Sequence, residues 1–496
     1  MVRGVCAVQG GCERPSPPMQ RCDPWPWGYD VAAEGATYRQ SARTAPMAII
    51  PQTKLFGWEE VENLGELRRL ELVLCTVPDE ALMRHLEGRR GRGRDDYPVR
   101  AVWNAVLAGV VYQHVSVESL RRELLRNAQL RWLCGFDPVK PAEQAVPPSW
   151  VFSRSLKKLM ACQEMIDGMF DELVEELRGE LEGFGSDLAC DSKAVRTHAR
   201  ARGKQKQRAL EPDGRRDTDA DVGVKTYRGQ REDGTVWEKV RKWFGYKLHL
   251  VVDADYELPV AYEVTRASAP DNASASRMLD DLEARHGAML GGCTALMADK
   301  AYDDTKLIKK LWDRDDPILP VIPKRQDWKD GEDTRPLCEG ADNIVYDCQG
   351  QVYCHCWVSG KRRELVYWGY ERERDSQKWR CPAAVYGVEC ESCERCNGHS
   401  TYGRVVRVAR ELDPRTFLPV ARGSLKFSRL YKKRTSVERV NSRLDVSFGL
   451  EQHFIRGEAK MRARCSLALV VMLAMALGRV REKQRGKLRS LVAAPG

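Results

Sequence analysis

The sequence predicts an α/β protein in which an all-helical N-terminal region precedes a mixed sheet covered by helices. Apolar residues recur at helical spacing over 57–136 and 150–181, with charged residues between them. From Ser186 onward, short apolar runs rich in β-branched and aromatic residues alternate with helical segments. Over 326–425 the composition shifts to Cys, Trp, Tyr and charge, so we expect an insertion in the sheet domain there.

The first segment, 1–46, is rich in Pro, Gly and scattered Cys, and no apolar run of a signal peptide follows Arg3. We expect either a disordered arm or a misassigned start, with translation beginning at Met47. Residues 47–182 are then expected to form a helical domain that binds DNA or a second subunit.

The α/β domain is expected to begin at 183 and to continue to 325. Its predicted elements are strands at 186–195, 243–253 and 258–268, a helix at 274–287, a strand at 294–304, a helix at 305–315 and a strand at 317–324. Three strands followed by helix, strand, helix and strand are typical of a mixed sheet covered by helices. Residues 426–496 are expected to add the C-terminal helices of this domain.

Charge is distributed unevenly along the 496 residues, whose net charge is +10. Cations cluster in 193–208 and again in 422–443. Two such blocks favour nucleic acid as the partner, although a single charge run is more often a solvated surface. The apolar run at 466–477 is too short to span a bilayer, so we expect a buried core helix and no membrane partner.

Three carboxylates stand out at places where metal-dependent cleavage of a phosphodiester would need them. Asp191 ends an apolar run, Asp299 ends another, and Glu438 is the only acid between Arg422 and Arg443. Converging carboxylates bind Mg²⁺ or Mn²⁺ in preference to zinc. Taken singly, an aspartate at a strand end is usually a turn residue, and Thr435 with Glu438 also matches a T-x-x-E capping box.

Taken together, the motifs resemble a known family. They are CDSKAV at 190–195, GYKLHLVVD at 245–253, ADKAYDD at 298–304, and Y-x2-R-x3-E at Tyr431, Arg434 and Glu438. This order resembles the DDE transposases of bacterial insertion sequences, more narrowly the IS-four/IS-five superfamily, and the helical stretch 97–136 resembles the N-terminal domain of that superfamily.

The resemblance implies an RNase H-like catalytic domain in which Asp191, Asp299 and Glu438 bind Mg²⁺ or Mn²⁺. It implies an enzyme that cuts DNA at transposon ends and joins them to target DNA, acting as a homodimer in a synaptic complex. It also implies a cytoplasmic, nucleoid-associated protein of a bacterium. Two alternatives stay open: a domesticated or inactive relic that binds DNA without cutting it, and an RNase H-like nuclease that hydrolyses without joining.

The basic segment around Glu438 is expected to hold transposon-end DNA. The expected contacts are Tyr431, Lys432, Lys433, Arg434, Arg439 and Arg443. Seven residues after Glu438 the family signature has a lysine, where this chain has Asp445. The phosphate contact of that lysine is therefore either missing or supplied by Arg443.

The cysteines of the insertion have the spacing of a zinc site. Cys390, Cys393 and Cys396 follow C-x2-C-x2-C, which lets successive thiolates reach one tetrahedral ion. Cys381 is the preferred fourth ligand and His399 the second choice. A further site among Cys338, Cys348, Cys354 and Cys356 is less regular in spacing, and a cluster of reduced buried thiols is the alternative to both.

Overall fold

The computed structural model describes residues 64–90, 96–137, 139–201, 217–231, 233–338, 343–397 and 400–492. The segment 1–46, for which we expect an arm or a misassigned start, lies outside these ranges. From Leu64 onward the chain forms one compact unit.

Helices occupy the part of the chain for which the apolar spacing predicts them. They are η1 (Gly65–Leu67), α2 (Arg68–Leu74), α3 (Glu80–Gly88), α4 (Val99–Val111), α5 (Val117–Arg126), α6 (Ala128–Cys134), α7 (Ala142–Ala145), α8 (Ser149–Met160) and α9 (Gln163–Glu180). Specific residues define the start of α5 and the end of α6. Ser116 and Ser119 form a capping box at the start of α5. Gly135, with φ +90°, ends α6.

The largest sheet follows the N-terminal helices in the sequence. Its strands are β1 (Asp187–Arg196), β2 (Asp221–Gln230), β3 (Val236–Asp253), β4 (Leu258–Arg266), β5 (Ala295–Ala298) and β6 (Leu319–Val321), with α10 (Asp271–Gly291), η3 (Lys300–Tyr302) and α11 (Thr305–Trp312) between them. The strand order is β4-β3-β1-β5-β6, and β2 pairs with the first half of β3. β3 is antiparallel to β1 and β4, while β1, β5 and β6 are parallel. This mixed sheet is the RNase H-like fold that the resemblance implies.

Residues 326–425 hold two small sheets. The first contains β7 (Arg335–Pro336), β8 (Ile344–Tyr346), β9 (Val352–His355) and β10 (Arg362–Glu364), and the second contains β11 (Val366–Glu371), β12 (Ser376–Arg380) and β13 (Val405–Ala409). Short helices accompany them: η4 (Arg372–Arg374), α12 (Pro382–Tyr386), α13 (Cys393–Asn397) and η5 (Arg410–Leu412). Trp379 and Phe417 centre a hydrophobic cluster separate from that of the larger sheet. The segment therefore has a small core of its own.

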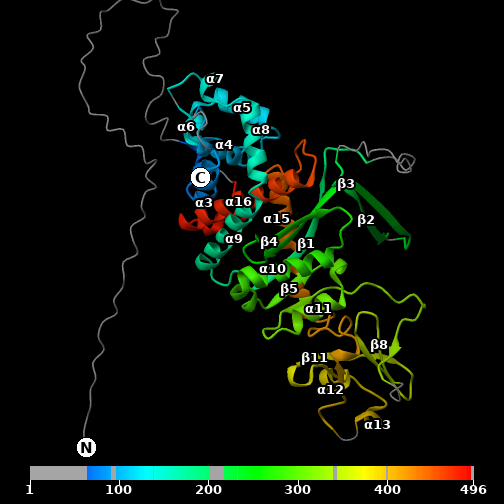
Figure 1. Cartoon of the computed structure of the whole chain (residues 1–496). Coiled ribbons are helices and arrows are strands. Elements are labelled where there is room, and N and C mark those ends of the chain that lie inside the picture. Colours follow the sequence, from blue (N-terminus) through cyan, green and yellow to red (C-terminus); the bar gives the residue numbers. More distant parts are fainter. Residues whose placement is uncertain are drawn as a thin grey trace, which may run out of the picture. The chain divides into compact units, whose positions relative to one another are not determined.

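The chain ends in helices α14 (Leu425–Lys432), α15 (Thr435–Val446), α16 (Glu458–Arg481) and η6 (Arg485–Ser490). α16 includes the apolar run 466–477 and is long and apolar enough to cross a membrane, but 94% of its most apolar stretch is buried inside the protein. It packs on α2, α4, α8 and α9 as well as on β4, and Figure 1 shows it beside α9. The prediction of a buried core helix is confirmed.

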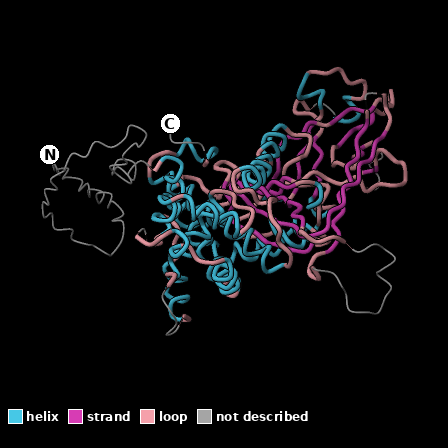
Figure 2. Tube along the Cα trace, turned by 90° about the horizontal axis from the view of Figure 1, so that it is seen from above, coloured by secondary structure: helices cyan, strands magenta, loops and turns pink. Residues whose placement is uncertain are grey.

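One hydrophobic core therefore continues from the N-terminal helices into the sheet. It runs from Leu67 in η1 through α16 to Leu491. Figure 2 shows the helices gathered toward one side of the molecule and most strands toward the other. On the sheet itself, α15 contacts β1 and β3, and α14 contacts β5 and β6. These contacts place the segment around Glu438 next to the strands that carry Asp191 and Asp299.

Candidate active site

Asp191 and Asp299 come together because of the strand register. β1 and β5 are parallel, and Cys190 of β1 lies opposite Ala298 of β5. The residues that follow them, Asp191 and Asp299, therefore lie next to each other where β5 ends. The backbone N–H of Ser192 donates to Asp191 Oδ1 at 2.7 Å, and that of Ala301 donates to Asp299 Oδ1 at 2.7 Å. Both carboxylates are thereby oriented by backbone donors.

The electrostatics of the pair show how concentrated the negative charge is. Burial and the neighbouring Asp299 raise the pKa of Asp191 to about 6, against the opposing effects of the Ser192 N–H, Lys225 and Arg434. Two carboxylates at one buried edge stabilise each other poorly unless a cation lies between them. The edge of the sheet therefore favours a bound cation.

Glu438 reaches this edge from α15. Lys433 and Arg434, between α14 and α15, keep right-handed helical dihedral angles, so the two helices follow each other almost without a break. Arg434 Nη2 donates to Glu438 Oε1 at 2.5 Å, and Arg434 Nη1 lies 3.4 Å from Asp191 Oδ2. One guanidinium therefore links Asp191 to Glu438.

The capping alternative for Glu438 does not hold. α15 does begin at Thr435, yet no side chain caps its N-terminus. The Thr435 hydroxyl donates to the carbonyl of Lys432 at 3.0 Å, and the Glu438 carboxylate accepts from Arg434 instead. The T-x-x-E pattern thus forms no capping box, and the Glu438 carboxylate is 53% exposed.

The donor set suits a hard divalent cation, since all three side chains offer carboxylate oxygens and two of them meet at a buried edge. Within the described ranges, however, no three His, Cys, Asp or Glu side chains are close enough to hold an ion together. Arg434 supplies the positive charge between Asp191 and Glu438 in this arrangement. The chemistry of the residues fits Mg²⁺ or Mn²⁺, provided that the guanidinium moves aside.

Some of the residues predicted to contact DNA are exposed to solvent, and others are engaged in ion pairs within the protein. Lys432 is exposed. Lys433 forms ion pairs with acids of β1 and of the β3–β4 turn, at 2.7 and 2.8 Å. Arg439 and Arg443 both pair with Glu257, at 2.5 and 2.9 Å. Arg443 is only 8% exposed, which places it in the interior and away from any DNA surface.

The aromatic member of the motif supports the guanidinium. The Tyr431 ring stacks on that of Phe427, with centroids 5.9 Å apart and planes 16° from parallel. The Arg434 guanidinium carbon lies 5.7 Å from the centroid of the Tyr431 ring. Tyr431 therefore holds Arg434 beside the acids, a contact that the sequence spacing alone does not reveal.

Asp445, which stands where the family signature has lysine, has a specific partner. Lys193 of β1 donates to Asp445 at 2.5 Å and to Glu451 at 2.9 Å. The cation at this position thus comes from β1, two residues after Asp191, and not from α15. Arg443 does not take the place of the missing lysine, because it is buried against Glu257. Sequence reasoning missed Lys193, and the acid at 445 was the signal that could have indicated it.

The cysteines of the insertion line one small cavity of about 30 Å³. Its thiols are those of Cys354, Cys356, Cys381, Cys390, Cys393 and Cys396. Burial, together with the nearby Cys381, Cys390 and Cys396, raises the pKa of Cys354 to about 11. Cys354, from β9, therefore lies with three of the four predicted zinc ligands, while Cys393 is exposed. His399 lies outside the described residues.

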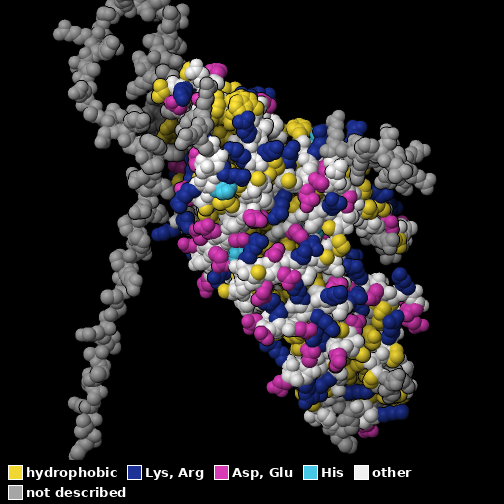
Figure 3. Space-filling model, viewed as in Figure 1, with side chains coloured by type: hydrophobic (Ala, Val, Ile, Leu, Met, Phe, Trp, Pro, Cys, Tyr) yellow, Lys and Arg dark blue, Asp and Glu magenta, His cyan; other side chains and the backbone are white. Residues whose placement is uncertain are grey.

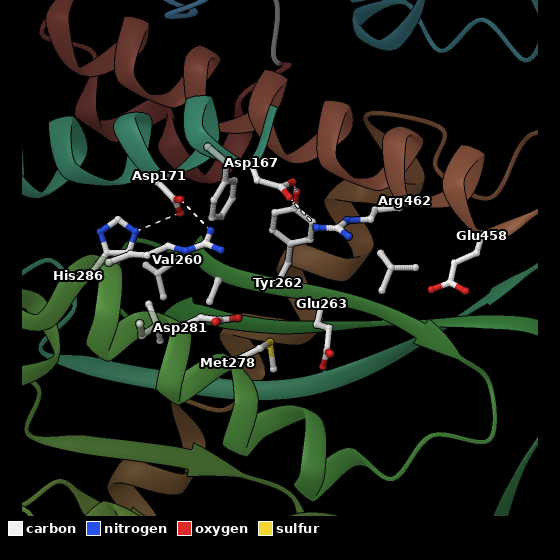
Figure 4. A pocket seen from close by; sticks show the side chains of 15 residues that line it. Asp167, Asp171, Val260, Tyr262, Glu263, Met278, Asp281, His286, Glu458 and Arg462 are labelled. Carbon is white, nitrogen blue, oxygen red and sulfur yellow. Dashed lines mark hydrogen bonds and ion pairs between the residues drawn. The ribbon is translucent and has the colours of Figure 1, made fainter. Parts of the chain in front are cut away.

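A larger cavity of about 320 Å³ lies between α9, β4, α10 and α16, and none of the three acids lines it. Figure 4 shows that several of its charged side chains are paired with one another. Asp171 accepts from Arg285 at 2.9 Å and lies 3.3 Å from a ring nitrogen of His286, and Arg462 donates to Asp167 at 2.6 Å. These pairs join helices to one another, which indicates a structural role.

Comparison with known proteins gives two family matches and one similar solved structure. Residues 183–474 match the family model described as Transposase DDE domain, and residues 60–154 match the one described as Transposase domain (DUF772). Among curated proteins none matches the chain. A solved structure of a piggyBac transposase synaptic complex with hairpin DNA is similar at 9% identity, covering 86% of this chain and 79% of that chain with a TM-score of 0.35.

Proposed function

Because the chain belongs to the DDE transposase family and is a DNA transposase, we propose that Asp191, Asp299 and Glu438 form the carboxylate triad of its reaction. The observation that carries this assignment is that Asp191 and Asp299 follow paired residues of the parallel strands β1 and β5, while Arg434 links Asp191 to Glu438. The family match gives the enzyme class, and the geometry supports these particular residues.

In the proposed reaction, water cleaves a phosphodiester at an insertion-sequence end and frees a 3′ hydroxyl. That hydroxyl then attacks a phosphodiester of target DNA and displaces its 3′ oxygen, so one bond forms as one breaks. A bound Mg²⁺ or Mn²⁺ would supply a Lewis acid for the phosphate and lower the pKa of the attacking water. Asp191 and Asp299 would hold it at the sheet edge, and Arg434 would orient Glu438 until DNA is bound.

The residues that we propose as DNA contacts are chosen by the solvent exposure of their side chains. Lys432 is exposed, and Tyr431 supports Arg434 next to the acids, so these residues are assigned to transposon-end DNA. Lys433 and Arg439 contribute charge at the same surface while bracing α15. Figure 3 shows Lys and Arg side chains interleaved with acidic ones over the visible face.

The assembly proposed is a homodimer at paired transposon ends, located on the bacterial nucleoid. Each chain carries one triad, and cutting two ends in concert needs two triads. The alternatives are an inactive DNA-binding relic and a nuclease without joining activity. Asp445 no longer favours the relic, because Lys193 places a cation at that position.

The decisive experiment incubates the full-length protein and Mg²⁺ with a linear donor that carries the ends of its own element. Asp191→Asn, Asp299→Asn and Glu438→Gln should each bind this DNA and leave it uncut. Glu172→Gln, an exposed acid on α9, serves as the matched control and should cut normally. Normal cutting by Glu438→Gln would remove Glu438 from the triad, and cutting without joined product would favour the nuclease.

A zinc site in the insertion is the second proposal, and the cavity lined by its thiols supports it. The preferred ligand set is Cys354, Cys381, Cys390 and Cys396, with Cys393 outside it. Four thiolates that coordinate one zinc ion tetrahedrally bind it tightly enough to stabilise a small domain. Metal analysis of purified protein should give one zinc per chain, lost in Cys354→Ser and kept in Cys393→Ser. The opposite pattern would restore the ligand set expected from spacing.

A further inference from the structure

β2 and the first half of β3 form a two-stranded ribbon that extends beyond the catalytic sheet (Figure 1). Its ladder runs from Asp221 opposite Gly245 to Gln230 opposite Val236. Every side chain from Val236 to Lys242 is exposed. A ladder of this length with both faces open to solvent gains little from burial, so its sequence is free to serve binding.

Two tryptophans fix the register of the ribbon. Trp243 lies opposite Gly223, and Trp237 lies opposite Gly229. A Cβ built on Gly223 would come within 2.3 Å of the Trp243 ring, and one on Gly229 within 2.6 Å of the Trp237 ring. Each ring therefore covers its glycine across the ribbon, and a slip by one residue would replace that space with a side chain.

The two faces of the ribbon differ in chemistry. Residues directly opposite each other share a face, and successive residues alternate between faces. Between the tryptophans, one face carries Lys225 opposite Arg241, and Lys239 one step further along. The other face carries Lys242, Glu238 and exposed valines, which are Val222, Val224, Val236 and Val240. We name the first of these, with its tryptophans, the basic face.

Lys225, Lys239 and Arg241 place three cations on one solvent-exposed face of the ribbon, which suits a polyanion as the partner. Lys239 and Arg241 are two residues apart on β3, about 6.6 Å, close to the rise of about 6.8 Å over two base pairs of duplex DNA. The major groove, about 12 Å wide, admits a two-stranded ribbon.

Gly245 lies where β3 passes from its pairing with β2 to its pairing with β1. Gly245 has φ +153°, and a Cβ there would lie 2.3 Å from the carbonyl oxygen of Val195 on β1. Only glycine accepts both this dihedral angle and this contact. Beyond Gly245, β3 runs along β1, and its Leu250 lies opposite Asp191. The ribbon is thus continuous with the strand that pairs beside Asp191.

We propose that the basic face binds the DNA duplex beside the scissile phosphate, with Lys225, Lys239 and Arg241 on backbone phosphates. Trp237, 39% exposed, packs against the sugars of the same strand. This inference deepens the proposed function, because Asp191 marks the point where the strand is cut. The ribbon adds a guiding surface for the flanking DNA that neither the basic helix nor the acids provide.

The test measures affinity of the full-length protein for a random-sequence duplex over a range of salt concentrations. A triple variant, Lys225→Gln with Lys239→Gln and Arg241→Gln, should make the slope of log K against log salt shallower by about 2.7, since each lost phosphate contact contributes about 0.9. Lys242→Gln, on the opposite face of the same strand, is the matched control and should leave the slope unchanged. An unchanged slope in the triple variant, or an equal loss in the control, would overturn the proposal.

A second measurement, by crosslinking, tests the same face without removing its charges, in case the triple variant misfolds the ribbon. A benzophenone side chain placed at position 239 should crosslink to nucleotides next to the cut, while one at position 242 should not. Crosslinks of equal yield from both positions would also overturn the assignment of the face. Asp191→Asn separates this from the proposed function: if that variant still cuts, the triad is wrong, whereas the slope and the crosslinks report on the ribbon alone.

Discussion

Glu257 anchors the helix that carries Glu438, and its removal gives a prediction that can be calculated from the structure. The residue sits in the β3–β4 turn with φ +58°, and its carboxylate is 2% exposed. Arg439 and Arg443 of α15 both donate to it, and Arg489 of η6 lies 3.6 Å away. Burial lowers the pKa of Arg443, and the Glu257 carboxylate opposes that shift.

Two variants of Glu257 separate its charge from its backbone. Glu257→Ala leaves buried guanidinium charge without its carboxylate, and breaking a buried pair in this way destabilises a protein by about 3–5 kcal/mol. Glu257→Gly loses the same charge but relieves a left-handed dihedral angle worth about 1–2 kcal/mol, offset by about 0.5–1 kcal/mol of glycine backbone entropy. The glycine variant should therefore be the more stable of the two, by up to about 1.5 kcal/mol.

Urea unfolding followed by circular dichroism measures both differences in the free energy of unfolding. A loss below about 1 kcal/mol in Glu257→Ala would show that the pair behaves as an exposed one and refute the argument from burial. A glycine variant less stable than the alanine variant would refute the argument from the dihedral angle.

Three further predictions concern other parts of the fold. Burial lowers the pKa of His286, but two carboxylates of α9 raise it by more, so it lies above its ordinary value. The stabilisation from His286 is then full below about pH 6.5 and lost as the pH rises through the folded pKa, so His286→Gln should lower the urea midpoint more at about pH 5 than at about pH 9. Gly245→Ala should lower the thermal midpoint, because its Cβ meets the β1 carbonyl at 2.3 Å; an unchanged midpoint would argue against this close contact. Lys193→Gln and Asp445→Asn should show a coupling energy of about 0.5–3 kcal/mol in a double-mutant cycle, and additive losses would mean that the two side chains act independently.

Most of the sheet and two of the acids follow from local pattern, but β2 and the part of β3 before Trp243 do not. Asp191 and Asp299 each end an apolar run, and parallel strands bring such ends together, so their meeting could be predicted from the sequence. The position of Glu438 required the family resemblance, because the local pattern favours a capping box. That box fails for a physical reason: Arg434, one turn earlier, binds the carboxylate more strongly than a backbone N–H does.

The partners of the basic residues could not be predicted in the same way. The acids paired with Lys433, Arg439 and Arg443 belong to β1 and to the β3–β4 turn, far away in the sequence, and only the docking of α15 brings them together. The insertion shows the same limit. Cys393 has the expected spacing from its neighbours but is exposed, whereas Cys354, from β9, lines the same cavity and is only partly exposed.

The packing of α16 has a consequence for how the protein is made. The N-terminal helices α2, α4, α8 and α9 bury their apolar sides against a helix that begins at Glu458. A ribosome makes the chain from the N-terminus, so these helices emerge with their shared groove still open and wait for nearly the entire polypeptide before it is filled. A truncated mRNA would yield a chain in which that groove stays exposed. Such a chain would be a target for chaperones and proteases. Truncated copies of the gene are thus expected to yield no stable DNA-binding fragment that could compete with the intact enzyme.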